Sequence, residues 1–199
     1  MKSLKLMHEK LIAYINQYSK LPLTAEEQAL VTTSFQPKKL RKKQYFLQEG
    51  DVCKYAGFIV KGAMRQYRVD DKGVEHIVQL FIENYWANDR ESSTMLTPSV
   101  YNIDAWEDTD ILLITRADML DLMAKIPSIT EMIRIMDERN AIANQRRLNS
   151  TISNTAEKRY EEFAKNHPQF IQRFPQHLIA SFLGITKETL SRIRKNAKK

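Results

Sequence analysis

The sequence predicts an α+β chain in which an N-terminal β-roll or jelly roll precedes a long helix and a C-terminal helix-turn-helix. Three observations predict this order. Short apolar runs separated by turn residues recur about every 8–12 residues between positions 38 and 114, as in β-sandwiches and jelly rolls. The stretch 128–166 contains neither proline nor glycine. The segment 176–195 holds two short helical patterns joined by Gly184.

Composition limits the class of protein. A chain of 199 residues can form one large or two small domains, and 43% hydrophobic with 28% charged residues is typical of a soluble globular protein. The single cysteine, Cys53, excludes an internal disulfide, a cysteine-ligated iron–sulfur cluster and a zinc finger. The sequence contains no signal-peptide pattern and no apolar run of membrane-spanning length, so we expect a cytoplasmic protein without a membrane partner.

The first forty residues predict two helices. Apolar residues at helical spacing indicate an amphipathic helix over 4–19, which Pro22 terminates. Thr24, followed three residues later by Glu27, is the capping-box pattern that begins a second short helix.

From Lys38 the pattern favours strands. The run at 38–43 is basic and indicates an edge strand, leaving open a solvated strand face or a nucleic-acid patch. The segment 70–73, Asp-Asp-Lys-Gly, is a hairpin turn. The remaining strand-like segments are 57–60, 64–69, 74–82 and two pieces within 101–114.

After Thr115 the pattern turns helical. A short helix over 117–126 ends at Pro127, and Ser128 is expected to cap a longer helix that reaches Asn166. Apolar and small residues recur along it at alternating four- and three-residue steps, which predicts a coiled-coil seam and therefore a homodimer. The alternative is a long helix lying on its own β domain. The predicted seam consists of Ile129, Ile133, Met136, Asn140 and Ala143.

The C-terminal pattern is that of a helix-turn-helix. Gly184 suits a left-handed helix end, and Thr186 suits the N-cap of the second helix. In that helix Leu190 and Ile193 face inward and leave a polar face for reading bases, because arginine can bond guanine and glutamate can accept from cytosine. A helical hairpin with a solvated basic face is the alternative. The candidate DNA-binding residues are Thr186, Lys187, Glu188, Thr189, Ser191, Arg192 and Lys195.

Charge is concentrated in the same segment. Six basic residues and one acid fall within 187–199, which is +5 of the formal net charge of +7. This excess, with an isoelectric point near 9.4, favours an acidic partner such as nucleic acid. Ribosome or membrane-surface binding, or a solubilising tail, would also explain it.

The order of β-roll, long helix and helix-turn-helix resembles the Crp/Fnr transcription regulators, relatives of the cyclic-AMP receptor protein, particularly the short Bacteroidetes members. The stretches that carry the resemblance are 50–77, GDVCKYAGFIVKGAMRQYRVDDKGVEHI, and 178–195, LIASFLGITKETLSRIRK. The resemblance implies a homodimer, a cyclic-nucleotide-binding-like sensor and a near-palindromic double-stranded DNA site. Lys187, Glu188 and Arg192 occupy its base-contacting positions, and RNA polymerase is a candidate partner.

The resemblance also implies three domains: a sensor with N-terminal helices over 1–116, a dimerisation region over 117–166 and a DNA-binding domain over 167–199. The chain ends just after the recognition helix, so a truncated winged helix is expected.

The sensor departs from the family pattern. Nucleotide binders present Gly-Glu for the ribose and Arg-Ser for the cyclic phosphate, where this chain has Asn88-Asp89 and Pro98-Ser99. Proline offers neither charge nor N–H to the cyclic phosphate, so we expect that the sensor does not bind cyclic AMP. No cofactor is expected. The pocket either takes an unknown small-molecule effector or is vestigial. Candidate pocket residues are Tyr85, Trp86, Asn88, Asp89, Arg90 and Ser99.

The sequence leaves two other function classes to consider. One is a ligand-responsive module that binds a protein partner through its basic tail. The other is a cupin-type metal enzyme. The four histidines argue against it, because they are scattered along the chain without an H-x-H or H-E-x-x-H spacing. The sequence therefore predicts no enzyme and no metal site.

Overall fold

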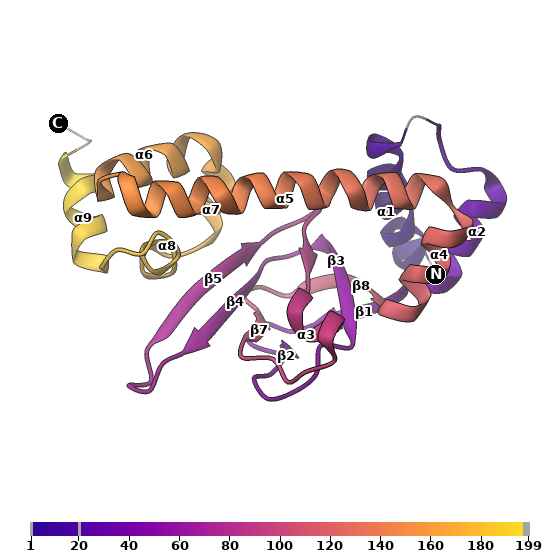
Figure 1. Cartoon of the computed structure of the whole chain (residues 1–199), viewed down its shortest axis with the longest axis horizontal. Coiled ribbons are helices and arrows are strands. Elements are labelled where there is room, and N and C mark those ends of the chain that lie inside the picture. Colours follow the sequence, from indigo (N-terminus) through magenta and orange to yellow (C-terminus); the bar gives the residue numbers. More distant parts are fainter. Residues whose placement is uncertain (1, 20, 197–199) are drawn as a thin grey trace. The chain divides into compact units, whose positions relative to one another are not determined.

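The apolar runs of the first half form two four-stranded sheets in the computed structural model, which describes residues 2–19 and 21–196 (Figure 1). The first sheet has the order β1 (Gln36–Leu40), β8 (Thr109–Thr115), β3 (Tyr55–Lys61) and β6 (Trp86–Ala87). The second has the order β2 (Tyr45–Leu47), β7 (Asn102–Ala105), β4 (Met64–Val69) and β5 (Glu75–Phe81). The pairings β1–β8, β3–β8, β3–β6 and β2–β7 are antiparallel. The α+β class and the N-terminal β-roll are confirmed.

The central strands β3 and β8 are buried on both faces, which explains why their sequences are continuous apolar runs. Phe58 and Leu112 face a cluster formed with the N-terminal helices. Ile59 and Ile111 face a second cluster, shared with residues of the second sheet such as Met64. A strand covered on both sides gains from apolar residues at every position rather than at alternate ones.

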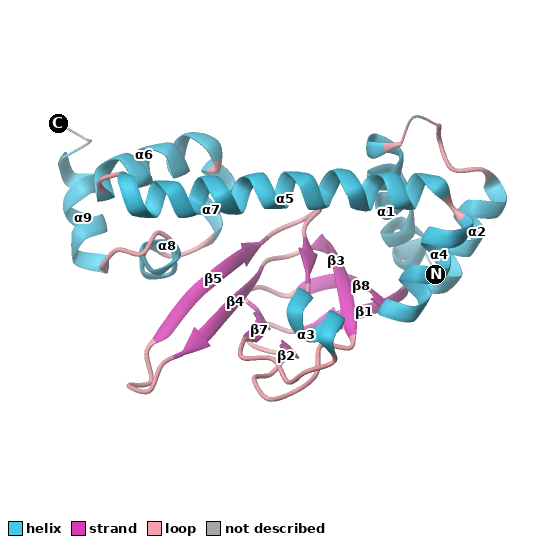
Figure 2. Ribbon diagram, viewed as in Figure 1, coloured by secondary structure: helices cyan, strands magenta, loops and turns pink. Residues whose placement is uncertain are grey.

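Three helices and the beginning of a fourth cover the outer face of the first sheet. They are α1 (Lys2–Tyr18), α2 (Ala25–Ser34), α4 (Arg116–Lys125) and the first half of α5 (Pro127–Ser153). Figure 2 shows α1, α2 and α4 grouped together beside the first sheet. The predicted capping box is present, since Glu27 N–H donates to Thr24 Oγ1 (3.2 Å) and Thr24 N–H donates to Glu27 Oε2 (2.8 Å).

The long helix differs from the prediction at its start. Helix α5 begins at Pro127 itself, so Ser128 lies inside the first turn rather than at the N-cap. Proline suits this position because its missing N–H would have no intrahelical partner there. The Ser128 hydroxyl instead donates to the carbonyl of Leu21 (3.5 Å).

The predicted end of the long helix is wrong. Helix α5 stops at Ser153, and a separate helix α6 (Ala156–Asn166) follows. Thr155 caps α6 by accepting from Lys158 N–H (3.3 Å), and the Asn154 amide donates to Ser150 Oγ (3.0 Å). These side-chain bonds satisfy the two helix ends, so a break forms without proline or glycine.

Three short elements were not predicted: β6, helix α3 (Arg90–Met95) and helix α7 (Pro168–Arg173). None is longer than six residues, and an element of that length is too short to show a hydrophobic period in the sequence. The predicted break at Asn166-His167-Pro168 is confirmed, because α6 ends at Asn166 and α7 begins at Pro168.

The chain forms two compact units. One contains the chain up to Gln66 together with Phe81–Glu138, and the other contains Tyr67–Leu80 together with the chain from Arg139 onward. The outer part of the β4–β5 hairpin is thus in the same compact unit as the C-terminal helices. Among the helices of residues 2–19 and 21–196, none is long and apolar enough to cross a membrane.

Candidate nucleic-acid interface and effector region

The predicted helix-turn-helix is formed by α8 (Gln176–Phe182) and α9 (Lys187–Asn196). Gly184 has a φ of +66°, the left-handed conformation that glycine adopts without strain. Its N–H donates to the Ser181 carbonyl (3.0 Å), and the Ile185 N–H donates to the Ala180 carbonyl (3.0 Å). This pair of bonds is a Schellman motif, which ends α8 and turns the chain into α9.

Apolar side chains hold the two helices in a fixed arrangement. Leu190 and Ile193 of α9 are buried, as the sequence predicted, and so are Leu178 and Ile179 of α8. A series of aromatic contacts from α6 and α7 supports them. The ring centroids of Phe163 and Phe182 lie 5.6 Å apart, those of Phe163 and Phe170 lie 6.1 Å apart, and those of Phe170 and Phe174 lie 5.9 Å apart.

The remaining face of α9 is polar and exposed. Its residues recur at three- and four-residue steps, so they share one side of the helix, where they line a shallow hollow of about 440 Å³. Among the described residues, none of the ion pairs involves a side chain of α9, so its basic groups are not neutralised within the chain. The lining residues are Lys187, Glu188, Ser191, Arg192 and Lys195.

The two predicted threonines have a structural role at the start of α9. Thr186 Oγ1 accepts from the Thr189 N–H (3.2 Å), which is the predicted N-cap, and the two hydroxyls are 3.0 Å apart. Of the predicted basic tail, Lys198 and Lys199 lie outside the described residues.

The predicted effector residues do not form one cluster. Trp86 joins the aromatic core, with its ring centroid 5.3 Å from that of Phe58 and its indole N–H buried without a hydrogen-bond partner. Tyr85 is half-buried, and burial raises the pKa of its hydroxyl. Asn88 is also half-buried.

Asp89 and Ser99 do come together, in a buried polar network. The Ser99 hydroxyl donates to Asp89 Oδ2 (2.7 Å), and Asp89 Oδ1 accepts from the Ser92 N–H (3.3 Å), which caps α3. Asp89 is 5% exposed and Ser99 is 3% exposed. The Cys53 N–H donates to the Ser92 hydroxyl (2.9 Å), and burial raises the pKa of the Cys53 thiol. Sequence reasoning missed Ser92 and Cys53, since a polar residue in an irregular stretch gives no pattern.

Arg90 points to the long helix rather than into this network. Its guanidinium forms a bidentate ion pair with Asp137 of α5, with Nη1–Oδ1 and Nη2–Oδ2 distances of 2.7 and 2.5 Å. The hydrogen bond that Arg90 donates to Asp137 raises the pKa of Arg90, so the cation remains charged.

The residues of the predicted dimer seam fall into two groups in the structure, one packed on the chain's own core and one exposed. Ile129 is 1% exposed, and Ile133 and Met136 pack on the same core of their own chain. Ile129 is therefore not available to a second protomer, and the first half of α5 follows the alternative of a helix lying on its own β domain. Asn140 and Ala143 remain exposed.

Residues 37–126 match the family model described as the cyclic nucleotide-binding domain. These residues are similar to the cyclic nucleotide-binding domain family. No curated protein sequence matched the chain.

Solved structures extend the likeness of the cyclic nucleotide-binding domain to the helices that follow it. FixK2 from Bradyrhizobium japonicum superposes with a TM-score of 0.67 at 17% identity over 81% of this chain and 83% of that chain. A protein from Eubacterium rectale assigned to the crp/fnr family of transcriptional regulators gives 0.62 at 15% identity over 88% and 84%. The Catabolite Activator Protein of Thermus thermophilus gives 0.55 at 20% identity over 87% and 83%. The chain has the fold of the Crp/Fnr regulators, as the sequence predicted.

Proposed function

We propose that the protein is a homodimeric, sequence-specific DNA-binding transcription regulator of the Crp/Fnr type that acts in the cytoplasm. The observation that carries this proposal is the exposed polar face of α9, held outward by the buried Leu190 and Ile193. Arginine, lysine, glutamate and serine on one helix face are the side chains that bond base edges and phosphates. The fold agrees, because the Crp/Fnr proteins it resembles are transcription regulators.

A dimer is the second part of the proposal. Ile142 and Leu148 on the second half of α5 are exposed in the single chain, whereas Arg147 between them contacts Val78 and Phe182. Helices in water gain most of their stability from packing, and an unsupported polar helix is marginal. Three large apolar residues lie on the second half of α5, within a sector of about 120°. They are Ile142, Leu148 and Ile152, with 48%, 60% and 76% of their surface exposed.

A second copy of α5 is the partner that would cover these residues. Each recognition helix would then read one half of a near-palindromic site, with half-sites roughly 34 Å apart. RNA polymerase is a further proposed partner.

The cyclic nucleotide-binding domain is proposed not to bind cyclic AMP. The buried Asp89 carboxylate already uses both oxygens within the domain, and a second anion beside it would meet like-charge repulsion. Arg90, the nearest basic residue in sequence, is held by Asp137. An effector of another kind, if one acts, must find a different set of contacts.

Selection of bound duplexes from a random pool tests the function. We expect one enriched sequence, retained in competition against its scrambled form, and the same enrichment with or without cyclic AMP. Equal retention of all duplexes would instead support the alternative, a ligand-responsive module that binds a protein partner. Enrichment only with cyclic AMP would contradict the proposed sensor.

A further inference from the structure

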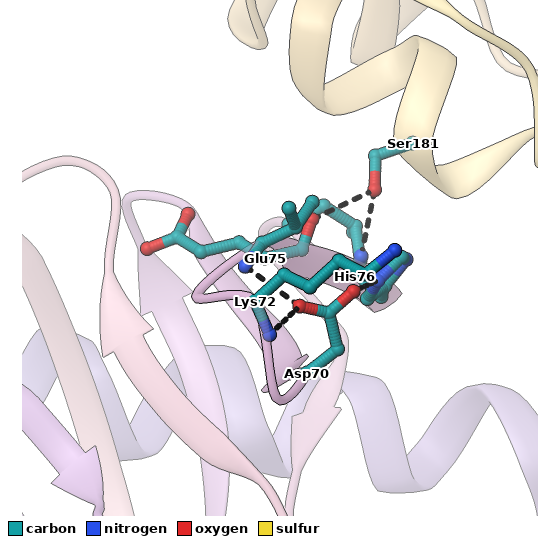
Figure 3. Close-up of polar contacts among 7 residues, drawn as sticks. Asp70, Lys72, Glu75, His76 and Ser181 are labelled. Carbon is teal, nitrogen blue, oxygen red and sulfur yellow. Dashed lines mark hydrogen bonds and ion pairs between the residues drawn. The ribbon is translucent and has the colours of Figure 1, made fainter.

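The outer part of the β4–β5 hairpin is fixed by its own turn. Asp70 Oδ1 accepts from the N–H groups of Lys72 and Val74 (both 2.9 Å), and Oδ2 pairs with His76 Nε2 (2.8 Å; Figure 3). The hydrogen bond from His76 holds the pKa of Asp70 below its ordinary value, so the carboxylate remains ionised. The hairpin therefore presents a defined edge.

That edge is the outer side of β5, the last strand of the second sheet. Outer strands carry backbone groups that no further strand satisfies. Ser181 of α8 supplies a partner. Its hydroxyl accepts from the Ile77 N–H (2.9 Å) and donates to the Glu75 carbonyl (3.3 Å), as Figure 3 shows. One hydroxyl thus bonds two backbone groups of β5 that a neighbouring strand would otherwise bond.

A second side chain contacts the same strand from α5. Arg147 Nη1 donates to the Val78 carbonyl (2.6 Å), and its guanidinium lies over the ring of Phe182 at 5.1 Å from the centroid. Burial lowers the pKa of this guanidinium. Phe182 directly follows Ser181, so both contacts act at the C-terminal turn of α8.

The C-terminal turn of α8 sets the direction in which the chain enters α9. The Ser181 carbonyl accepts from Gly184 in the Schellman motif, while its hydroxyl holds β5. A single residue therefore connects the strand edge to the start of the recognition helix.

We propose that Ser181 and Arg147 are positioning residues for DNA recognition: they form a clasp that fixes the helix-turn-helix on the edge of β5. This inference rests on the proposed DNA-binding function. Fixing the helices before binding removes motion that DNA would otherwise have to restrict, so the clasp raises affinity by preorganisation.

The first test uses the free protein and needs no DNA. Amide hydrogen exchange at Ile77 is measured in the wild type, Ser181→Ala and Ser181→Thr, with Ile59 as an internal control because its N–H donates to the Tyr85 carbonyl in the other unit. We expect exchange at Ile77 to be about tenfold or more faster in the alanine variant and near wild type in the threonine variant, which keeps the hydroxyl. Unchanged exchange in Ser181→Ala would refute the clasp.

The second test measures affinity for a selected duplex. Ser181→Ala and Arg147→Met are expected to bind about 3–10-fold more weakly, since both lose contacts to β5. Ser181→Thr and the neighbouring control Arg146→Met are expected to remain within about twofold. Circular dichroism melting identifies any variant that fails to fold. If Ser181→Ala does not fold, Ser181→Thr is compared with the wild type instead.

The outcomes separate the clasp from the function. If Ile77 exchange accelerates in Ser181→Ala while DNA affinity is unchanged or tighter, the positioning role is wrong. If the wild type selects no duplex, the proposed function fails and the DNA role of the clasp fails with it, whereas the exchange measurement still decides whether the clasp holds the free protein.

Discussion

Arg192 lies on the exposed face of α9, between Glu188 and Lys195 along the helix. Replacing it with alanine is expected to cost about 1–3 kcal/mol of discrimination at one base pair, because a two-bond contact to guanine is lost. Duplex selection with Arg192→Ala measures the change as a relaxed preference at one position in each half-site.

The matched control for this change is Lys165→Ala, which removes the same charge from an exposed position on α6. It is expected to leave the selected sequence unchanged. A selection profile for Arg192→Ala that matches the wild type would show that this side chain does not read a base.

Gly62 is required by both its backbone and its surroundings. Its φ is +108°, and a Cβ would lie 2.7 Å from the Asp108 carbonyl oxygen and 2.5 Å from Thr109 Oγ1. Gly62→Ala is expected to destabilise the protein by about 2–5 kcal/mol, from left-handed strain and overpacking together. Gly73→Ala, with φ of +79° and open space around its Cβ, is expected to cost about 1–2 kcal/mol from strain alone.

Chemical denaturation of the two alanine variants measures this difference. Equal losses of unfolding free energy at Gly62 and Gly73 would mean that the contact with Thr109 relaxes without cost.

Single residues also mark the limit of sequence reasoning. Gly184, Leu190 and Thr186 could be placed because their roles depend on neighbours within a few positions. Ser181 bonds to strand β5 more than 100 residues earlier in the chain, so only the folded chain reveals its role. The pairing of Arg90 with Asp137 across 47 positions was hidden for the same reason.

At the scale of elements, the junction of α6 and α7 contains a titratable group in an aromatic setting. The ring centroid of His167 lies 5.5 Å from that of Phe163 and 5.6 Å from that of Phe170. Burial lowers the pKa of His167 below its ordinary value of 6.5. The unfolded chain therefore binds a proton at a higher pH than the folded chain.

The contribution of the neutral His167 ring to the free energy of unfolding is therefore complete above pH 6.5. It is lost as the pH falls from there toward the pKa of His167 in the folded state. The free energy of unfolding is expected to fall between pH 7.5 and pH 5.5, and His167→Gln is expected to reduce this slope. His177→Gln at an exposed site serves as the control. A slope for His167→Gln as steep as the wild type would place the titrating group elsewhere.

The prediction of helices and strands succeeded where burial produces a long run of apolar residues. It failed where a few local polar contacts determine the end of an element. β3 and β8 were visible because apolar residues fill both faces. The end of α5 at Ser153 was not, because Asn154 and Thr155 make a break with side-chain bonds in a stretch that otherwise suits a helix. The Ser, Asn and Thr residues between 149 and 155 were the signal available for it.

At the scale of the whole molecule, the proposed dimer can be tested by two neighbouring substitutions. Ile142 and Ala143 are both exposed on α5 and point to different sides of the helix. Ile142→Glu is expected to produce a monomer, because it places a charge in the exposed apolar sector. Ala143→Glu lies on the seam predicted from the sequence and is expected to leave the dimer intact.

Sedimentation equilibrium at micromolar concentration distinguishes the two variants. Dissociation by Ala143→Glu alone would restore the original seam, and a monomeric wild type would remove the dimer from the proposal.

The central claim is that two recognition helices together read one DNA site. Its most direct test is the dissociation constant for the selected duplex compared with that for the same duplex with one half-site scrambled, at a fixed physiological salt concentration. The account predicts that scrambling one half removes most of the advantage over non-specific DNA, which is on the order of 10³-fold or more for specific regulators. Equal affinity for the intact and the half-scrambled duplex would contradict it.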